Sequence, residues 1–183
     1  VKHVMGVKGR GAGRQMFESG EATIDYQTSA AYLKNSTPLV ESGKAVVMMS
    51  WGALDKRGNI VRDPTFPNVP TFKEVCEKTD GCNTSGPKWE AWKAFFIAGF
   101  PVQKAAFLPA GTPDNVIYTY AQAFKKITER PDFAALSAKR LGKYPVYTGS
   151  DAGNALNAAL RVTPEAKSFI KGYLKEQFGV DLK

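Results

Sequence analysis

The chain has 183 residues and a mass of 19.9 kDa, about one domain, and its 43% hydrophobic and 23% charged residues are typical of globular packing. It contains two cysteines and one histidine, which excludes a disulfide-rich miniprotein and a His/Cys metal cluster, and its longest apolar runs are too short to cross a bilayer. The net charge of +8 fits nucleic-acid binding, attraction of small anions or solubility alone, but the basic residues are dispersed, so we expect no nucleic-acid partner.

The first fifty residues alternate between strand-like and helix-like sequence. Strands are predicted at 1–7, 21–26 and 44–50, and helices at 12–19 and from Thr28 or Ser29 onward. The strand at 44–50 has a continuous apolar centre, which is typical of a strand covered on both faces. This order of elements predicts an α/β fold with parallel strand pairs.

The rest of the chain is predicted to be mainly helical. A proline-rich loop is expected at 55–70, and an aromatic-rich stretch at 89–100 has the spacing of a helix face. Two long helices are predicted to start at 112–114 and at 163–165. Each segment has a threonine that can cap a helix, followed by a proline and an acidic residue. The remaining predictions are helices at 71–76, 131–142 and 150–160, and strands at 104–108 and 145–147.

A cluster of four glycines between residues 6 and 13 is the first candidate site. It lacks the lysine and hydroxyl residue of a nucleotide-binding phosphate loop and the spacing of a dinucleotide fingerprint. Backbone amides at the start of a helix could face an anion here, with Lys8, Arg10 or Arg14 nearby. The alternative is an ordinary tight turn between a strand and a helix.

The second candidate site is the segment Asp25, Tyr26, Gln27 and Thr28, where a predicted strand ends and a helix begins. Ligands of open α/β sheets bind at the carboxyl ends of strands, and free amides with polar side chains there could hold a carboxylate. The alternative is that Thr28 or its neighbour only caps its own helix and that Asp25 is a turn residue.

The two cysteines, Cys76 and Cys82, lie six positions apart in a loop rich in turn-forming residues. In an oxidising compartment they could close a small structural disulfide, and in a reducing one they would be free thiols. Their spacing fits neither a zinc site nor a redox motif, and the sequence offers no metal-ligand cluster.

No set of side chains predicts catalysis. The aromatic residues of 89–100 could line a pocket, although such groups more often form a core. The single histidine, His3, lies in a predicted strand, where we expect it to pack. Without an acid–base pair or an activated nucleophile, we expect a binding protein that uses no cofactor and not an enzyme.

Several motifs in fixed order resemble the receptor proteins of tripartite tricarboxylate transporters, the Bug-type extracytoplasmic solute-binding proteins. The resemblance covers nearly the whole chain, with departures at Val7, where an aromatic residue is common, and at 80–88, which looks inserted. The similar segments are 3–9, 18–25, 41–44, FPNVPTFKE at 66–74, FLPAGTP at 107–113 and PDF at 131–133.

The resemblance implies a fold as well as a family. It implies an α/β, periplasmic-binding-protein (type II-like) lobe with a mainly parallel sheet, followed by C-terminal helices. Residues 1–100 would form the second-lobe portion, and residues 101–183 a crossover strand and helices that return to the first lobe. The chain would then begin inside the second lobe, without the first lobe's opening strands.

The resemblance also implies a function. It places Lys8 and Gly9, and the segment Asp25–Thr28, near an interlobe cleft that binds a small organic acid. The receptor would deliver this ligand to a membrane permease and would be periplasmic. Two alternatives stay open: a ligand-sensing regulatory domain of similar fold, and an unrecognised α/β enzyme. A homodimer that covers exposed helix faces is a further possibility.

Overall fold

The computed structural model describes residues 4, 6–55, 58–100 and 104–182, and 51% of these described residues are helical. A short hairpin joins β1 (Ala53–Leu54) to the antiparallel β2 (Ile60–Val61). The helices are α1 (Arg10–Glu18), α2 (Ser29–Ala31), the π-helical turn η1 (Tyr32–Ser36), α3 (Thr37–Glu41), α4 (Phe72–Cys76), α5 (Gly86–Gly99), α6 (Asp114–Thr128), α7 (Phe133–Arg140), α8 (Ser150–Ala159) and α9 (Pro164–Phe178).

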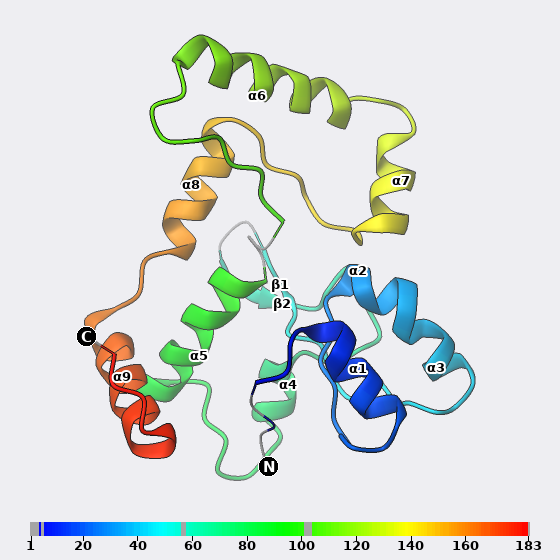
Figure 1. The fold of residues 1–183 in the computed structure, drawn as a ribbon, viewed down its shortest axis with the longest axis vertical. Helices are drawn as coiled ribbons and strands as arrows, with labels where there is room; N and C mark the ends of the chain where they lie inside the picture. Colours follow the sequence, from blue (N-terminus) through cyan, green and yellow to red (C-terminus); the bar gives the residue numbers. More distant parts are fainter. Residues whose placement is uncertain (1–3, 5, 56–57, 101–103, 183) are drawn as a thin grey trace.

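The elements form a body and an arm (Figure 1). The body contains α1 to α5, the hairpin and α9, which packs along α5. The arm, residues 104–149, carries α6 and α7 on long extended connections, and α8 leads from the arm back to the body, where it contacts α5. The arm therefore extends away from the main core.

The core of the body is aromatic and is organised by α5. Phe96 is 1% exposed, and its ring stacks on Trp92 with centroids 5.3 Å apart. Trp92 in turn lies 4.5 Å from Trp89 and 4.8 Å from Phe72 of α4, measured between ring centroids. The aromatic residues of the 89–100 stretch thus serve mainly as core, one of the two alternatives that the sequence left open.

A capping box fixes the start of α4. The Thr71 side chain accepts a hydrogen bond from the Glu74 amide, and the Glu74 carboxylate accepts one from the Thr71 amide at 2.8 Å. The Nε of Arg62, which follows β2, donates to both carboxylate oxygens of Glu74 at 3.0 and 3.1 Å, and its Nη2 lies 2.9 Å from Oε1. This bidentate pair ties the hairpin to α4.

The Glu74 contacts make a pH-dependent prediction. Hydrogen bonds from Arg62, and next from the Thr71 amide, lower the pKa of Glu74 from 4.5 to about 2. Because the pKa is lower in the folded state, the stabilisation is present above pH 4.5 and is lost as the pH falls toward 2. We expect Glu74→Gln to flatten the decline in unfolding free energy across this range, as measured by urea denaturation at a series of pH values.

The matched control is Glu77→Gln on the same helix. Glu77 forms an exposed pair with Lys73 four residues earlier, and such pairs contribute little. A Glu74→Gln protein that keeps the full acid sensitivity of the wild type would show that the carboxylate is not held in this way.

The predicted fold class is wrong. The structure has no mainly parallel sheet, and its only sheet within the described residues is the two-stranded antiparallel hairpin β1–β2. An isolated parallel bridge between Ser50 and Thr71 is the sole parallel pairing in the described part of the chain. The second strand of this hairpin, β2, lies inside the region that was predicted as a loop at 55–70. The predicted division at residue 100 is not tested and stays a prediction.

The predicted strands lack neighbours, which is the physical reason for the error. The segments 21–26, 44–50, 104–108 and 145–147 contain no strand in the structure. In the segment 44–50, Val46 is 84% exposed and Met48 is 67% exposed, whereas the alternate residues are half-buried. A strand becomes part of a sheet only when another strand pairs with its amides and carbonyls. The alternation of apolar and polar residues in one segment does not show whether such a partner strand exists. The strand predicted at 1–7, with His3, falls largely outside the described residues.

The predicted helices are largely confirmed, because their signals are local. Thr163 caps α9 by accepting a hydrogen bond from the Ala166 amide at 3.1 Å, and Gly179 ends it in the left-handed conformation. Thr112, by contrast, donates to the Pro109 carbonyl and does not cap α6. In the described part of the chain, no helix has both the length and the apolar character needed to cross a membrane.

Candidate functional site

The N-terminus of α1 presents backbone amides without a side-chain cap. The helix begins after Gly9, whose φ of 144° is readily reached only by glycine and whose missing side chain cannot accept from the first turn. A Cβ added at Gly9 or at Gly11 would meet no atom within 4 Å. No side chain therefore caps the first turn of α1 or crowds its glycines.

The segment after residue 24 folds back onto this turn. Gln27 Nε2 donates to the carbonyl oxygen of Arg10 at 3.0 Å and to Asp25 Oδ2 at 2.7 Å. A Cβ on Gly13 would lie 3.3 Å from Asp25 Oδ1, so the absence of a side chain lets the two segments approach closely. The structure thus brings the glycine turn into contact with the second candidate segment.

Arg10 provides the positive charge at this turn. Its Nη2 donates to the Tyr26 hydroxyl at 3.1 Å, and its Cζ lies 5.1 Å from the centroid of the Tyr26 ring. Burial raises the pKa of Tyr26, and the Arg10 charge opposes that shift only in part, so the hydroxyl stays protonated at neutral pH. Among the described residues Arg10 has no carboxylate partner, so its charge is available to an anion.

The predicted site residues differ in their roles. Lys8 is exposed, and Gly9 forms the turn. Thr28 is 7% exposed and accepts a hydrogen bond from the Ala31 amide at 3.3 Å as the cap of α2, which favours the capping alternative for this residue. Asp25 would repel an anion, and its hydrogen bond with Gln27 makes it a positioning group.

Gln27 carries an unused acceptor. Its Oε1 is buried and has no hydrogen-bond partner among the described residues. Its amide nitrogen is occupied by the Arg10 carbonyl and Asp25, which fixes the side chain between the two segments. The accessible part of the site is therefore a cation beside free amides.

The aromatic core packs against Tyr26 of the candidate site. The Tyr26 ring lies 5.3 Å from that of Phe100 and 6.1 Å from that of Trp51, measured between centroids. Phe100 and Trp51 are themselves 5.8 Å apart and contact α5 rings. Packing of the body therefore fixes the tyrosine that orients Arg10.

A second polar cluster was missed by the sequence analysis. The Tyr144 hydroxyl donates to Asp63 Oδ2 and also contacts Ser29 Oγ. Asp63 is 4% exposed, and its other oxygen accepts from the Thr65 amide at 2.7 Å. Thr65 Oγ1 accepts from the Lys143 amide at 2.9 Å. These contacts fasten the end of the arm to the body, and no local sequence signal links residues so far apart.

In this cluster the Tyr144 hydroxyl acts as a hydrogen-bond donor to Asp63. Burial, followed by the hydrogen bond to Asp63, raises its pKa to about 12, so the phenol is protonated at neutral pH. A groove of about 500 Å³ runs beside it along α7 and is lined by Phe133, Ser137 and Val146, among others. None of the predicted binding residues lines this groove.

Cys76 and Cys82 are joined by a disulfide in the structure, and Cys76 is 2% exposed. The bond closes the short loop that follows α4. In the part of the chain that the structure describes, His, Cys, Asp and Glu residues form no group of three that could hold a metal ion.

Comparisons with known proteins return no relatives. No protein-family model matches the chain, and searches of curated proteins and of solved structures find no significant match.

Proposed function

We propose that this chain binds a small organic carboxylate at the N-terminus of α1, as the solute-binding receptor of a tripartite tricarboxylate-type transporter. The observation that carries the proposal is the convergence of the Gly9–Arg10 turn with Tyr26 and Gln27 through the contacts of Arg10. The motif resemblance, which predicted the same two segments from sequence, adds support.

The chemistry of the site suits a carboxylate. Open amides at a helix start and the helix dipole favour a negative charge, and Arg10 can form charge-assisted hydrogen bonds with carboxylate oxygens. The net charge of +8 would speed the encounter with an anion.

The transport role follows from the same proposal. The receptor would work outside the cytoplasm and hand its ligand to permease subunits in the membrane. The disulfide between Cys76 and Cys82 supports this location, because such bonds persist in oxidising compartments. The site holds no acid–base pair that would act on the ligand.

Substitution of Arg10 tests the proposal. We expect Arg10→Ala to weaken carboxylate binding by about 10-fold or more, the effect of losing a charged hydrogen bond. Isothermal titration with dicarboxylates, tricarboxylates and aromatic acids provides the measurement, and thermal shift provides the initial screen.

Arg14→Ala is the matched control, since Arg14 lies one turn later on α1 and already pairs with Glu18 at 3.1 Å. Its affinity is expected to stay near that of the wild type. Equal binding by wild type and Arg10→Ala, or stabilisation of the protein only by ligands that are not acids, would remove the basis of the proposal.

A further inference from the structure

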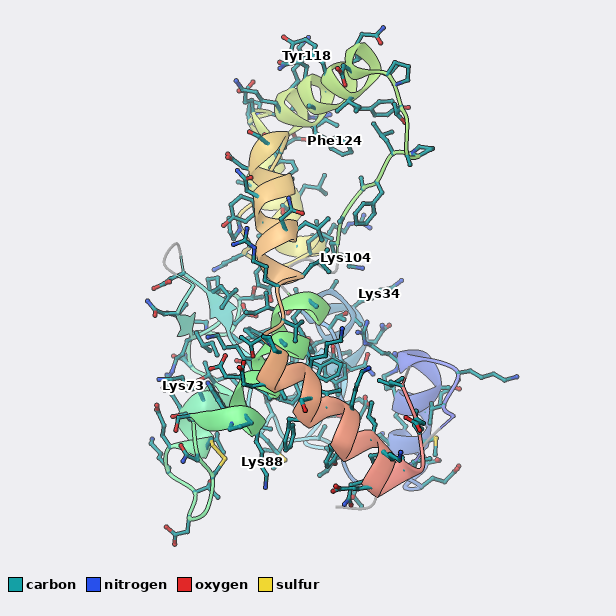
Figure 2. All side chains as sticks on the ribbon, turned by 90° about the vertical axis from the view of Figure 1, so that its left-hand side faces the viewer. Lys34, Lys73, Lys88, Lys104, Tyr118 and Phe124 are labelled. Atoms are coloured by element: carbon teal, nitrogen blue, oxygen red, sulfur yellow. A yellow bond between two sulfur atoms is a disulfide. The ribbon has the colours of Figure 1, made fainter. Side chains whose placement is uncertain are left out.

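The groove along α7 plays no part in the proposed function. Its volume of about 500 Å³ lies within the range of small-molecule sites. Figure 1 and Figure 2 show α7 between α6 and the body, so the groove lies where the arm meets the body. Its walls are mainly apolar and include Phe133, Ala134, Ala138 and Val146.

Contacts with the body hold one wall of this groove in place. The Tyr144 hydroxyl donates to the buried Asp63 and contacts Ser29. Gly142 has a φ of 104°, and a Cβ there would lie 2.6 Å from Tyr144 Cε2 and 2.8 Å from Thr65 Oγ1. The glycine therefore lets the tyrosine ring lie directly against the chain. A wall that is fixed before a ligand arrives lowers the ordering cost of binding.

Two polar side chains that line the groove are unoccupied. Lys143 is exposed, and its ammonium group has no carboxylate partner among the described residues. Ser137 is half-buried, and its hydroxyl makes no hydrogen bond within the part of the chain that the structure describes. The groove therefore combines apolar walls with one cation and one hydroxyl donor.

The charge of this segment favours an anion. Residues 133–149 contain Lys139, Arg140 and Lys143 and no acidic residue. Lys139 and Arg140 also complement the dipole at the C-terminus of α7, whereas Lys143 lies beyond the helix. The Asp63 carboxylate is only 4% exposed and is engaged by Tyr144, so it does not neutralise this charge at the surface.

We propose that this groove binds a monocarboxylate with an apolar body, of the size of a medium-chain fatty acid. The carboxylate pairs with Lys143, and the apolar body lies against Phe133, Ala138 and Val146. A ligand with several carboxylates is disfavoured, because its further charges would lie unpaired against apolar walls. This is a second site, separate from the one proposed at the N-terminus of α1.

Titration with octanoate tests the ligand class. Isothermal titration of the wild type should show saturable binding, and each methylene added between hexanoate and octanoate should strengthen it by up to about 4-fold. Octylammonium has the same apolar body and the opposite charge, so its binding should be at least about 10-fold weaker than that of octanoate.

Two pairs of variants test the groove. Ala134→Trp fills it and should weaken octanoate binding by about 10-fold or more, whereas Ala135→Trp, one residue away and outside the lining, should bind as the wild type does. Lys143→Gln should weaken binding by about 3–10-fold and keep the dependence on chain length. Its control, Lys126→Gln, removes the same charge from the exposed surface of α6.

Amide chemical shifts of the nitrogen-15-labelled wild type locate the ligand. Octanoate should shift the signals of residues 133–146. Shifts confined to residues 9–14 and 25–28 would place octanoate at α1, which would overturn the groove and leave the proposed function standing.

Three further results would overturn the proposal: no saturable binding of octanoate, full binding by Ala134→Trp, or equal affinity for octylammonium. If Ala134→Trp loses its helical circular dichroism spectrum, the chain-length series, the amide shifts and Lys143→Gln judge the groove without it.

Discussion

Replacing Phe96 by alanine is expected to lower the free energy of unfolding by about 3–5 kcal/mol, the range for deleting a buried aromatic ring. Phe96 is 1% exposed and lies between the ring of Trp92 at 5.3 Å and that of Phe100 at 5.9 Å. Removal of the Phe96 ring would leave a cavity in the aromatic core, on the face of α5 that packs against the body. Chemical denaturation followed by tryptophan fluorescence measures the change.

The neighbouring residue provides the control. Phe95 is on the same helix but is 61% exposed, so Phe95→Ala should change the unfolding free energy by no more than about 0.5 kcal/mol. Similar effects of the two substitutions would mean that the α5 face against the body is not the core described above.

The aromatic core also determines the geometry of the candidate site. Phe100 contacts both Phe96 and Tyr26, and Tyr26 orients Arg10. A cavity at Phe96 should therefore loosen the tyrosine as well as the core. Phe100 thus links the core around α5 to the tyrosine that contacts Arg10.

The helices could be predicted because their signals lie within a few residues. The caps at Thr71 and Thr163, for example, need only a hydroxyl and an amide three positions later. The apolar face of α6 could likewise be predicted from apolar residues that recur every three or four positions. This spacing could not show that the face remains half-exposed in the folded chain.

The sheet could not be predicted because strand pairing depends on distant segments. The run 44–50 has the composition of a buried strand, yet Val46 and Met48 are exposed and the described residues provide no neighbouring strand. The strand predicted there is wrong, because composition alone carries no information on whether another strand pairs with the segment.

The candidate site was predictable in part. The glycine turn and the residues Asp25 to Thr28 were identified as separate segments, and the side chains of Arg10 and Gln27 join them. The cluster of Asp63 and Tyr144 was not predictable, since its members are 81 residues apart and neither belongs to a recognisable motif.

Replacing Tyr144 by phenylalanine is expected to lower the free energy of unfolding by about 2–3 kcal/mol, because it leaves the buried Asp63 carboxylate without one of its two donors. The ring is kept, so the loss reports on the hydroxyl alone. Tyr147→Phe is the control, since Tyr147 is 53% exposed and lies three residues away. Equal stability of the Tyr144→Phe and wild-type proteins would mean that the hydroxyl does not fasten the arm.

The same substitution should change the response to alkaline pH. The pKa of Tyr144 is raised from 10.0 to about 12 in the folded state, so its stabilisation is complete below pH 10 and is lost as the pH rises toward 12. Part of the alkaline decline in wild-type stability should be missing from Tyr144→Phe, while Tyr147→Phe should retain it. An identical decline in all three proteins would exclude the buried phenol as its source, and the attachment of the arm would then depend on the Thr65–Lys143 contact.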